Sequence, residues 1–127
     1  MHEKAVYEYA VVRIVPRVER EEFVNVGLLM MCKRRRRLEM RIKIDTTKLS
    51  AMAPATDLDD AIRQLHGFER ICRGESAAGP IAQYPVEERF RWLTAAKSAC
   101  VQTSRPHPGL TTDFDNTFDR LFAELVD

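Results

Sequence analysis

The residues with the most evident chemical capacity form three groups, and the first surrounds His107. This histidine lies in a proline-rich stretch, near the hydroxyls of Ser104 and Thr111. A histidine beside a serine could support nucleophilic catalysis, but the sequence shows no nucleophile elbow and no third orienting group at a recognisable spacing. A histidine that bonds the loop backbone is therefore favoured, and a small enzyme using His107 is kept as an alternative.

A run of five consecutive basic residues is the second group. Arginine clusters of this length can bind the phosphate backbone of a nucleic acid. However, the run lies where the chain must turn between two apolar segments, charge is readily solvated there, and no interleaved aromatic residue offers base stacking. A solvated turn is favoured. A binding role for the run would become more credible only if other basic residues lay beside it in the folded protein. It comprises Lys33, Arg34, Arg35, Arg36 and Arg37.

The third group is the arginine-rich segment 89–98, which has the pattern of a helix. Arg89, Trp92 and Lys97 can gather on one side of such a helix. An arginine beside a tryptophan and a hydroxyl could hold an anion or a nucleobase. The alternative buries Trp92 in the core and pairs the arginines with surface carboxylates such as Glu87. The sequence gives the two interpretations nearly equal weight.

Composition restricts the class of protein. The chain has 127 residues, which fits one domain over residues 1–127. It carries 20 Lys and Arg against 19 Asp and Glu, a formal net charge of +1, so overall charge selects neither nucleic acid nor an acidic membrane. No apolar run reaches the roughly 20 residues that span a bilayer, and the first residues lack the apolar core of a signal peptide. A cytoplasmic location is predicted.

Potential metal ligands are scattered. Cys32, Cys72 and Cys100 are odd in number, far apart and free of paired Cys or His spacing, which argues against a disulfide framework and a structural zinc site. His66 and His107 also lack companion ligands three or four residues away. Reduced, mostly buried thiols are predicted, and neither a metal nor a cofactor is expected.

The elements that must position these residues begin with a sheet. Residues 5–15 and 23–32 are rich in β-branched and other apolar side chains on both faces, so both faces must be covered. Residues 38–45 alternate between apolar and charged side chains, which is typical of an edge strand guarded by its charges. Residues 98–104 are a fourth candidate strand, and the Pro- and Gly-rich stretch 105–109 is predicted to be irregular.

The second predicted strand contains Asn25 and Gly27 among apolar residues. A glycine inside a strand marks a bulge or a close backbone approach, and an asparagine can bond the free groups of a neighbouring strand. This structural interpretation is favoured over a pocket in which Asn25 lies beside Glu22 and Arg17.

Helical periodicity follows the third strand. Asp57 is the expected N-cap of the first helix and Gly74 its stop, while residues 48–56 are a predicted connector. Thr112 or Asp113 would cap the last helix, whose aromatic and leucine positions must dock on the sheet. The three predicted helices cover residues 57–73, 85–95 and 113–126.

These elements predict an α+β protein with a single domain, in which an antiparallel sheet of about four strands packs with three helices. Three helices on one face would leave the other face of the first two strands uncovered, unless a helix crosses over. A homodimer is therefore an expectation as well.

Several segments together carry a family resemblance: Tyr9–Arg13 with Pro16 and Arg17, Glu21–Gly27, Arg89–Thr94, His107, Gly109–Thr111 and Asp119–Phe122. The chain resembles a bacterial family catalogued as domain of unknown function 3037, and the resemblance covers nearly its whole length. It implies no activity, but it implies a protein partner, because members are often encoded beside a HipA-like kinase. One departure is the basic run, where family members commonly have a turn-forming segment, and this argues against the run as the shared function.

Five positions that match the family pattern lie near the ends of predicted elements, where loops can converge on a shared site. If two of their arginines meet, repulsion would favour a bound anion or an acidic partner group held by charge-assisted hydrogen bonds. Alternatively, the glutamates within residues 19–22 neutralise the arginines in a structural ion-pair network. The five positions are Arg17, Asn25, Arg89, Arg91 and His107.

Three functions follow from these patterns. The leading hypothesis is a non-catalytic interaction or accessory module, with a HipA-like kinase as the partner that the resemblance implies. The second is a nucleic-acid or anion-binding protein that uses the basic run 33–37 or a pocket of Arg17, Arg89 and Arg91. The third is the small enzyme using His107, and an enzyme is the less favoured class.

Overall fold

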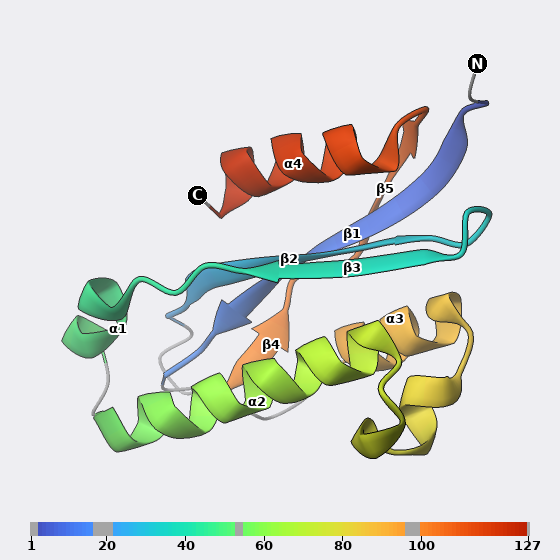
Figure 1. Ribbon diagram of the computed structural model, residues 1–127. Coiled ribbons are helices and arrows are strands. Elements are labelled where there is room, and N and C mark those ends of the chain that lie inside the picture. The colour runs from blue at the N-terminus through green and yellow to red at the C-terminus, as the bar shows by residue number, and fades with distance from the viewer. Residues whose placement is uncertain (1–2, 17–21, 53–54, 96–99, 127) are drawn as a thin grey trace.

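The computed structural model describes residues 3–16, 22–52, 55–95 and 100–126. Within these residues the chain forms a five-stranded antiparallel sheet with helices on both sides (Figure 1). The predicted α+β class is therefore confirmed. The strands are β1 (Ala5–Ile14), β2 (Val24–Cys32), β3 (Arg37–Ile42), β4 (Val101–Thr103) and β5 (His107–Thr111).

β1 is the central strand. It pairs with β2 on one side and with β4 and β5 on the other, so the order is β3-β2-β1-β4, with β5 beside the first half of β1. The two strands predicted to be covered on both faces, β1 and β2, are the most buried, because helices pack on each side of them. β3 alternates between half-buried and more exposed residues and lies at the edge.

β2 is irregular next to Asn25. Val12 pairs with Gly27, whereas the next residue of β1 pairs with Asn25, so one residue of β2 is left over as a bulge. A Cβ on Gly27 would lie 2.9 Å from the carbonyl oxygen of Arg41. Glycine therefore lets β3 approach closely at this point, and the structural interpretation of Gly27 is confirmed.

Four α-helices lie in the described part of the chain. The last one begins as predicted, because Asp113 accepts a hydrogen bond from the backbone N–H of Asn116 at 3.1 Å and so caps the helix. The helices are α1 (Thr46–Met52), α2 (Ala55–Arg73), α3 (Val86–Thr94) and α4 (Phe114–Leu125), with the 3-10 turns η2 (Ser76–Ala78) and η3 (Pro80–Gln83) between α2 and α3.

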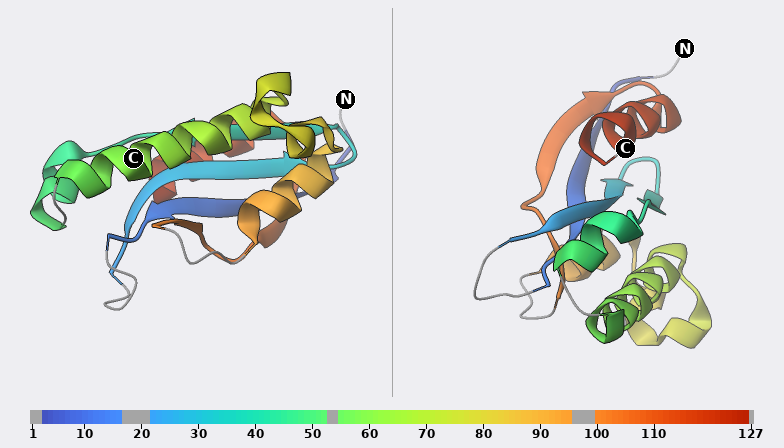
Figure 2. Two further views of the ribbon diagram at one scale, coloured as in Figure 1. Left: turned by 90° about the horizontal axis from the view of Figure 1, so that it is seen from below. Right: turned by 90° about the vertical axis from the view of Figure 1, so that its left-hand side faces the viewer.

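The helices divide between the two faces of the sheet, as Figures 1 and 2 show. α2 and α3 pack on one face, where Leu65, Phe90 and Leu93 join β-strand side chains in one core. α4 packs on the other face and forms a second core around Phe118 and Phe122. A helix thus crosses over, and the uncovered face that led us to expect a homodimer is covered within one chain.

The prediction of a connector over residues 48–56 is wrong in part, because α1 occupies its first half. Asp45 follows β3, and its carboxylate accepts hydrogen bonds from the backbone N–H groups two and three residues later, at 3.1 and 3.2 Å. This cap starts α1, and Leu49 anchors the helix in the first core. α2 begins at Ala55, two residues before the predicted cap Asp57.

The prediction of an irregular stretch over residues 105–109 is also wrong, because β5 begins inside it. β5 is an edge strand, where a proline is tolerated if its missing N–H faces away from the neighbouring strand. Gly109 lies under the ring of Tyr7, and a Cβ there would be 2.4 Å from ring atoms, so glycine makes room for the aromatic side chain. Of the predicted strand 98–104, β4 occupies residues 101–103, and residues 98–99 lie outside the described part.

Candidate binding groove

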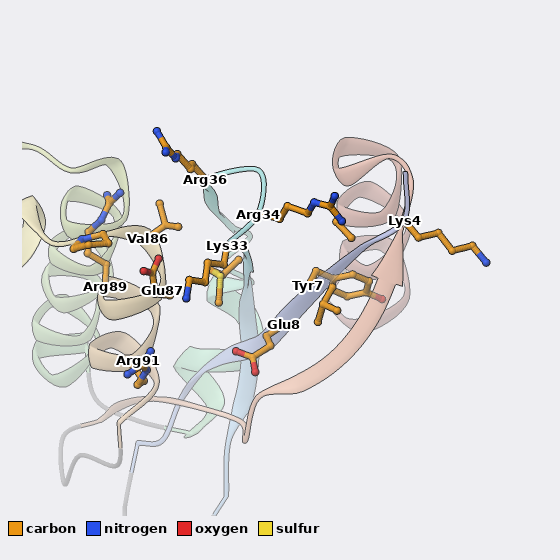
Figure 3. A pocket seen from close by; sticks show the side chains of 14 residues that line it. Lys4, Tyr7, Glu8, Lys33, Arg34, Arg36, Val86, Glu87, Arg89 and Arg91 are labelled. Carbon is orange, nitrogen blue, oxygen red and sulfur yellow. The ribbon is translucent and has the colours of Figure 1, made fainter. Parts of the chain in front are cut away.

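A groove of about 1180 Å³ opens between the β2–β3 hairpin turn, the start of β1 and the start of α3 (Figure 3). Six basic but only two acidic side chains line it, so its potential is positive although the whole chain is nearly neutral. We call it the basic groove. Its charged residues are Lys4, Lys33, Arg34, Arg36, Arg89, Arg91, Glu8 and Glu87.

The basic groove unites two groups that the sequence kept apart. Arg89 and Arg91 of α3 line the same groove as three residues of the basic run. Other basic residues therefore lie beside the basic run in the folded protein, which was the condition for giving the run a binding role. His107 and Asn25 lie elsewhere, and Arg17 falls outside the described residues.

Arg89 has a structural role on the side of the groove that α3 forms. Its guanidinium donates hydrogen bonds to the carbonyl oxygens of Tyr84 (2.9 Å), Ile71 (3.2 Å) and Cys72 (2.8 Å). Two of these carbonyls belong to the last turn of α2, where a positive charge is favoured by the helix dipole. The turn then ends at Gly74, whose φ of 74° confirms the predicted stop. Arg89 thus joins α2 to α3 through backbone oxygens.

The hairpin turn brings the basic run over the groove. The carbonyl oxygen of Lys33 accepts a hydrogen bond from the backbone N–H of Arg36 at 3.1 Å, which closes a turn over residues 33–36. Arg36 has a φ of 53°, a left-handed conformation that is uncommon without glycine. The predicted turn is confirmed, and Arg37 is already the first residue of β3.

Three arginines of the run have partners within the protein. Arg34 forms an ion pair of 2.7 Å with the Glu3 carboxylate, and Arg35 donates to the Glu3 carbonyl oxygen at 2.7 Å. Arg37 pairs with Asp115 of α4 at 2.7 Å. These contacts fasten the turn to the start of β1 and to α4, so most of the run is structural.

Four of the six cations in the groove make no side-chain hydrogen bond or ion pair with any other described residue. They are Lys4, Lys33, Arg36 and Arg91, of which the last three lie on the hairpin turn and on α3. Lys33 and Arg36 rise from the hairpin turn, and Arg91 projects from α3 on the other side (Figure 3). Cations on opposite walls repel each other across the groove, and a negatively charged ligand would relieve that repulsion.

The first turn of α3 adds to this potential. Pro85 occupies the N-cap position and supplies no capping side chain, and Pro85, Val86 and Glu87 all line the groove. The N–H of Glu88 donates to the carbonyl oxygen of Pro85 at 3.0 Å, whereas the N–H groups of the two residues before it precede the helical hydrogen bonds, and this end of the helix carries the positive end of the dipole. Glu87 offsets part of this charge, as expected for an acidic residue in the first turn.

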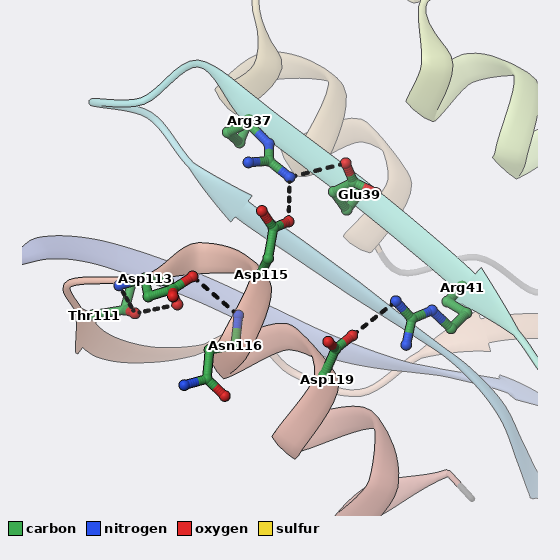
Figure 4. Close-up of polar contacts among 8 residues, drawn as sticks. All are labelled: Arg37, Glu39, Arg41, Thr111, Asp113, Asp115, Asn116 and Asp119. Carbon is green, nitrogen blue, oxygen red and sulfur yellow. Dashed lines mark hydrogen bonds and ion pairs between the residues drawn. The ribbon is translucent and has the colours of Figure 1, made fainter.

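A second cluster of charges fastens α4 to β3 on the other face of the sheet (Figure 4). Arg37 pairs with Asp115, and Arg41 pairs with Asp119 at 2.9 Å. The hydrogen bond between Arg37 and Asp115 raises the pKa of the arginine and lowers the pKa of Asp115. The guanidinium of Arg41 also lies 4.8 Å from the centre of the Phe118 ring. These arginines hold α4 in place.

The remaining predicted site residues have local contacts. Asn25 donates a hydrogen bond to the carbonyl oxygen of Leu125 at 3.2 Å, so it binds the end of α4 rather than a neighbouring strand. His107 is exposed on β5 and packs against Tyr9, with ring centres 5.2 Å apart. The Ser104 hydroxyl already accepts a hydrogen bond from the backbone N–H of Val11. No activated pair of histidine and hydroxyl is formed among the described residues.

The thiols and other metal-binding groups form no centre within the described part of the chain. Cys32 and Cys72 are buried free thiols, and burial raises the pKa of Cys72 to about 12, which keeps it protonated at neutral pH. No group of three or more His, Cys, Asp or Glu residues that could hold a metal ion occurs among the residues that the structure describes.

Residues 9–126 match the family described as "Protein of unknown function (DUF3037)". The chain belongs to the DUF3037 family. No curated protein and no solved structure matches it. The family resemblance inferred from the sequence is therefore confirmed over nearly the whole chain, although membership in DUF3037 specifies no activity. In addition, none of the helices among the described residues is long and apolar enough to cross a bilayer.

Proposed function

We propose that this DUF3037 protein is a non-catalytic binding module that takes a negatively charged partner in the basic groove. The observation that carries the proposal is the position of Lys33, Arg36 and Arg91 on two walls of one groove, with no ion-pair partner among the described residues. Cations held apart by a folded scaffold form a binding site whose electrostatic complement is an anion.

The contacts of His107 and Arg89 also bear on the alternative functions. An enzyme using His107 lacks a hydroxyl or carboxylate partner in the described residues, because Ser104 and Thr111 both bond other groups. Within the described residues Arg89 donates to backbone carbonyl oxygens and not to a carboxylate, whereas Arg17, Glu19 and Glu21 of the ion-pair alternative lie outside the described part of the chain. The uncommitted cations support binding of an anionic partner, which unites the interaction-module and anion-binding hypotheses.

The proposal is tested with fluorescently labelled polyglutamate, whose binding is followed by anisotropy at low salt and then at rising salt. We expect binding that weakens steeply with salt, because surface ion pairs are screened. The variant Lys33→Ser/Arg36→Ser/Arg91→Ser should bind about tenfold more weakly, because three exposed ion pairs of about 0.5 kcal/mol each amount to about 1.5 kcal/mol.

A matched control removes the same charge elsewhere. Lys48→Ser/Arg63→Ser/Arg120→Ser also deletes three exposed cations, but none of them lines the basic groove. This control should bind polyglutamate nearly as well as the wild type does. Equal losses in both variants would show non-specific attraction, and absence of binding at low salt would refute the proposal.

We further propose a cytoplasmic location and a HipA-like kinase as the first partner to test. Support for the location is the burial of the free thiols Cys32 and Cys72, which suits a reducing compartment. Support for the kinase is the family resemblance alone. Titration of a purified HipA-like kinase from the same cell, with wild type and groove variant side by side, should show binding that the groove variant loses.

A further inference from the structure

An exposed apolar pair lies beside the basic groove, and one of its two members lines the groove. Val6 of β1 is 60% exposed and Leu110 of β5 is 63% exposed, and the two residues are direct partners in the antiparallel pairing. Cross-strand partners place their side chains on the same face, in contact range. Val6 and Leu110 therefore form one apolar patch, and Val6 lines the groove.

This patch continues the face of the sheet that α2 and α3 cover elsewhere. Side chains alternate along β1, so Val6 points to the same side as Ala10, Val12 and Ile14, all of which are buried in the first core. Val6 itself is 60% exposed, so no helix covers it. An apolar surface that is buried along most of its length is thus left open at the groove.

The groove combines charge with apolar surface. Val6 lines it together with Lys33 and Arg36 of the hairpin turn and Arg91 of α3. A ligand that fits presents an apolar group to Val6 and negative charges to the cations of the hairpin turn and of α3. An amphipathic helix with an apolar stripe between acidic flanks has this arrangement.

We infer that the occupant of the basic groove is an acidic amphipathic helix of a partner protein, which seats an apolar side chain on Val6 and Leu110. The inference rests on the proposed function and specifies its partner. The groove, of about 1180 Å³, has room for the side chains of a polypeptide segment. Carboxylates of the helix pair with Lys33, Arg36 and Arg91.

Nucleic acid fits this surface less well. Proteins that bind single strands stack bases on exposed aromatic rings, and those that bind duplexes rely on dense phosphate contacts. The aromatic residue in the groove lining is Tyr7, which is only 7% exposed and belongs to the core on the α4 side. An apolar patch beside the cations has no counterpart on a sugar-phosphate backbone.

The test compares three labelled peptides and one labelled single-stranded DNA of matched charge. The first peptide is helix-forming, with a leucine stripe between glutamates; the second has the same composition in scrambled order; the third replaces the leucines by glutamine. We expect the first peptide to bind about tenfold more tightly than the others, because it alone buries the apolar pair. We also expect Val6→Ser/Leu110→Ser to abolish that advantage.

The outcomes separate this inference from the proposed function. Equal binding of all three peptides, unchanged by Val6→Ser/Leu110→Ser but lost in Lys33→Ser/Arg36→Ser/Arg91→Ser, would overturn the amphipathic helix and leave the anionic groove standing. Tighter binding of the DNA would overturn it in favour of nucleic acid. Absence of all binding would remove both proposals. The peptide substitutions keep the test decisive even if a protein variant folds poorly.

Discussion

Arg89 illustrates how a residue's role depends on groups that the sequence does not display. The sequence suggested either an anion site or an ion-pair network for this arginine. In the structure its partners are carbonyl oxygens of Tyr84, Ile71 and Cys72, two of them from another helix. Every residue has a carbonyl oxygen, so residue types could not reveal which ones the guanidinium would reach. The helix and its face were predictable, but the partners were not.

Replacing Arg89 by Lys tests this structural role. A single ammonium cannot span Tyr84 and the last turn of α2 together, so at least one of these carbonyl oxygens loses its donor. We expect a loss of about 1–3 kcal/mol in the free energy of unfolding, measured by urea denaturation with an unchanged slope. Arg91→Lys is the matched control on the same helix, and it should change stability by less than about 0.5 kcal/mol. Equal stability of both variants would contradict the assigned role.

α4 shows how far periodicity alone can predict an element. Its repeat of aromatic residues predicted a helix that docks on the sheet, and Phe114, Phe118 and Phe122 are buried there. Arg41 was among the charges expected to guard a solvent edge, whereas Arg37 was assigned to the basic run in the turn. Instead Arg37 and Arg41 reach across to carboxylates of α4, because that helix covers the same face. Periodicity thus predicted β3 and α4 as elements, but it did not predict that their side chains contact each other.

The ion pair between Arg37 and Asp115 predicts a dependence of stability on pH. The hydrogen bond from Arg37 lowers the pKa of Asp115 in the folded protein, so ionised Asp115 favours folding. This contribution is present above the unfolded pKa of about 3.8 and is lost as the pH falls through the lower folded value. Asp115→Asn should therefore melt a few degrees below the wild type at pH 7. This difference in melting temperature should disappear at acidic pH.

The control for this experiment is Asp59→Asn, on the exposed surface of α2, where the carboxylate has no ion pair with a described residue. Melting temperatures of the three proteins are compared by circular dichroism between neutral pH and pH 2. A constant difference between Asp115→Asn and the wild type across this range would show that the carboxylate charge is not what stabilises α4.

Two elements escaped prediction for local reasons. α1 is short, and its start depends on a cap by Asp45, a residue that the alternating pattern assigned to the preceding strand. β5 contains a proline and a glycine, which usually end a strand. Its register beside β1 is supported by the ring of Tyr7 over Gly109, a long-range contact that outweighs the local preference for a turn.

At the scale of the whole molecule, the basic groove exists only after the chain has folded. It is lined by the hairpin turn, the start of β1 and the start of α3, segments that are far apart in the sequence, and Leu110 of β5 lies beside it as the pairing partner of Val6. The sequence supplied most of the basic residues as separate groups. It gave no sign of Val6 or Leu110 as surface residues, because isolated apolar side chains in a strand or a short loop are usually read as core.

The most direct test of the account is to locate bound polyglutamate on the protein by NMR. The backbone amide signals of the ¹⁵N-labelled protein are followed during titration at low salt. We predict that the shifted amides cluster around Val6, the turn 33–36 and residues 86–91, and that the Lys33→Ser/Arg36→Ser/Arg91→Ser variant loses these shifts. Shifts spread evenly over the exposed faces of α2 and α4, with none centred on the groove, would contradict the assignment of this groove as the binding site.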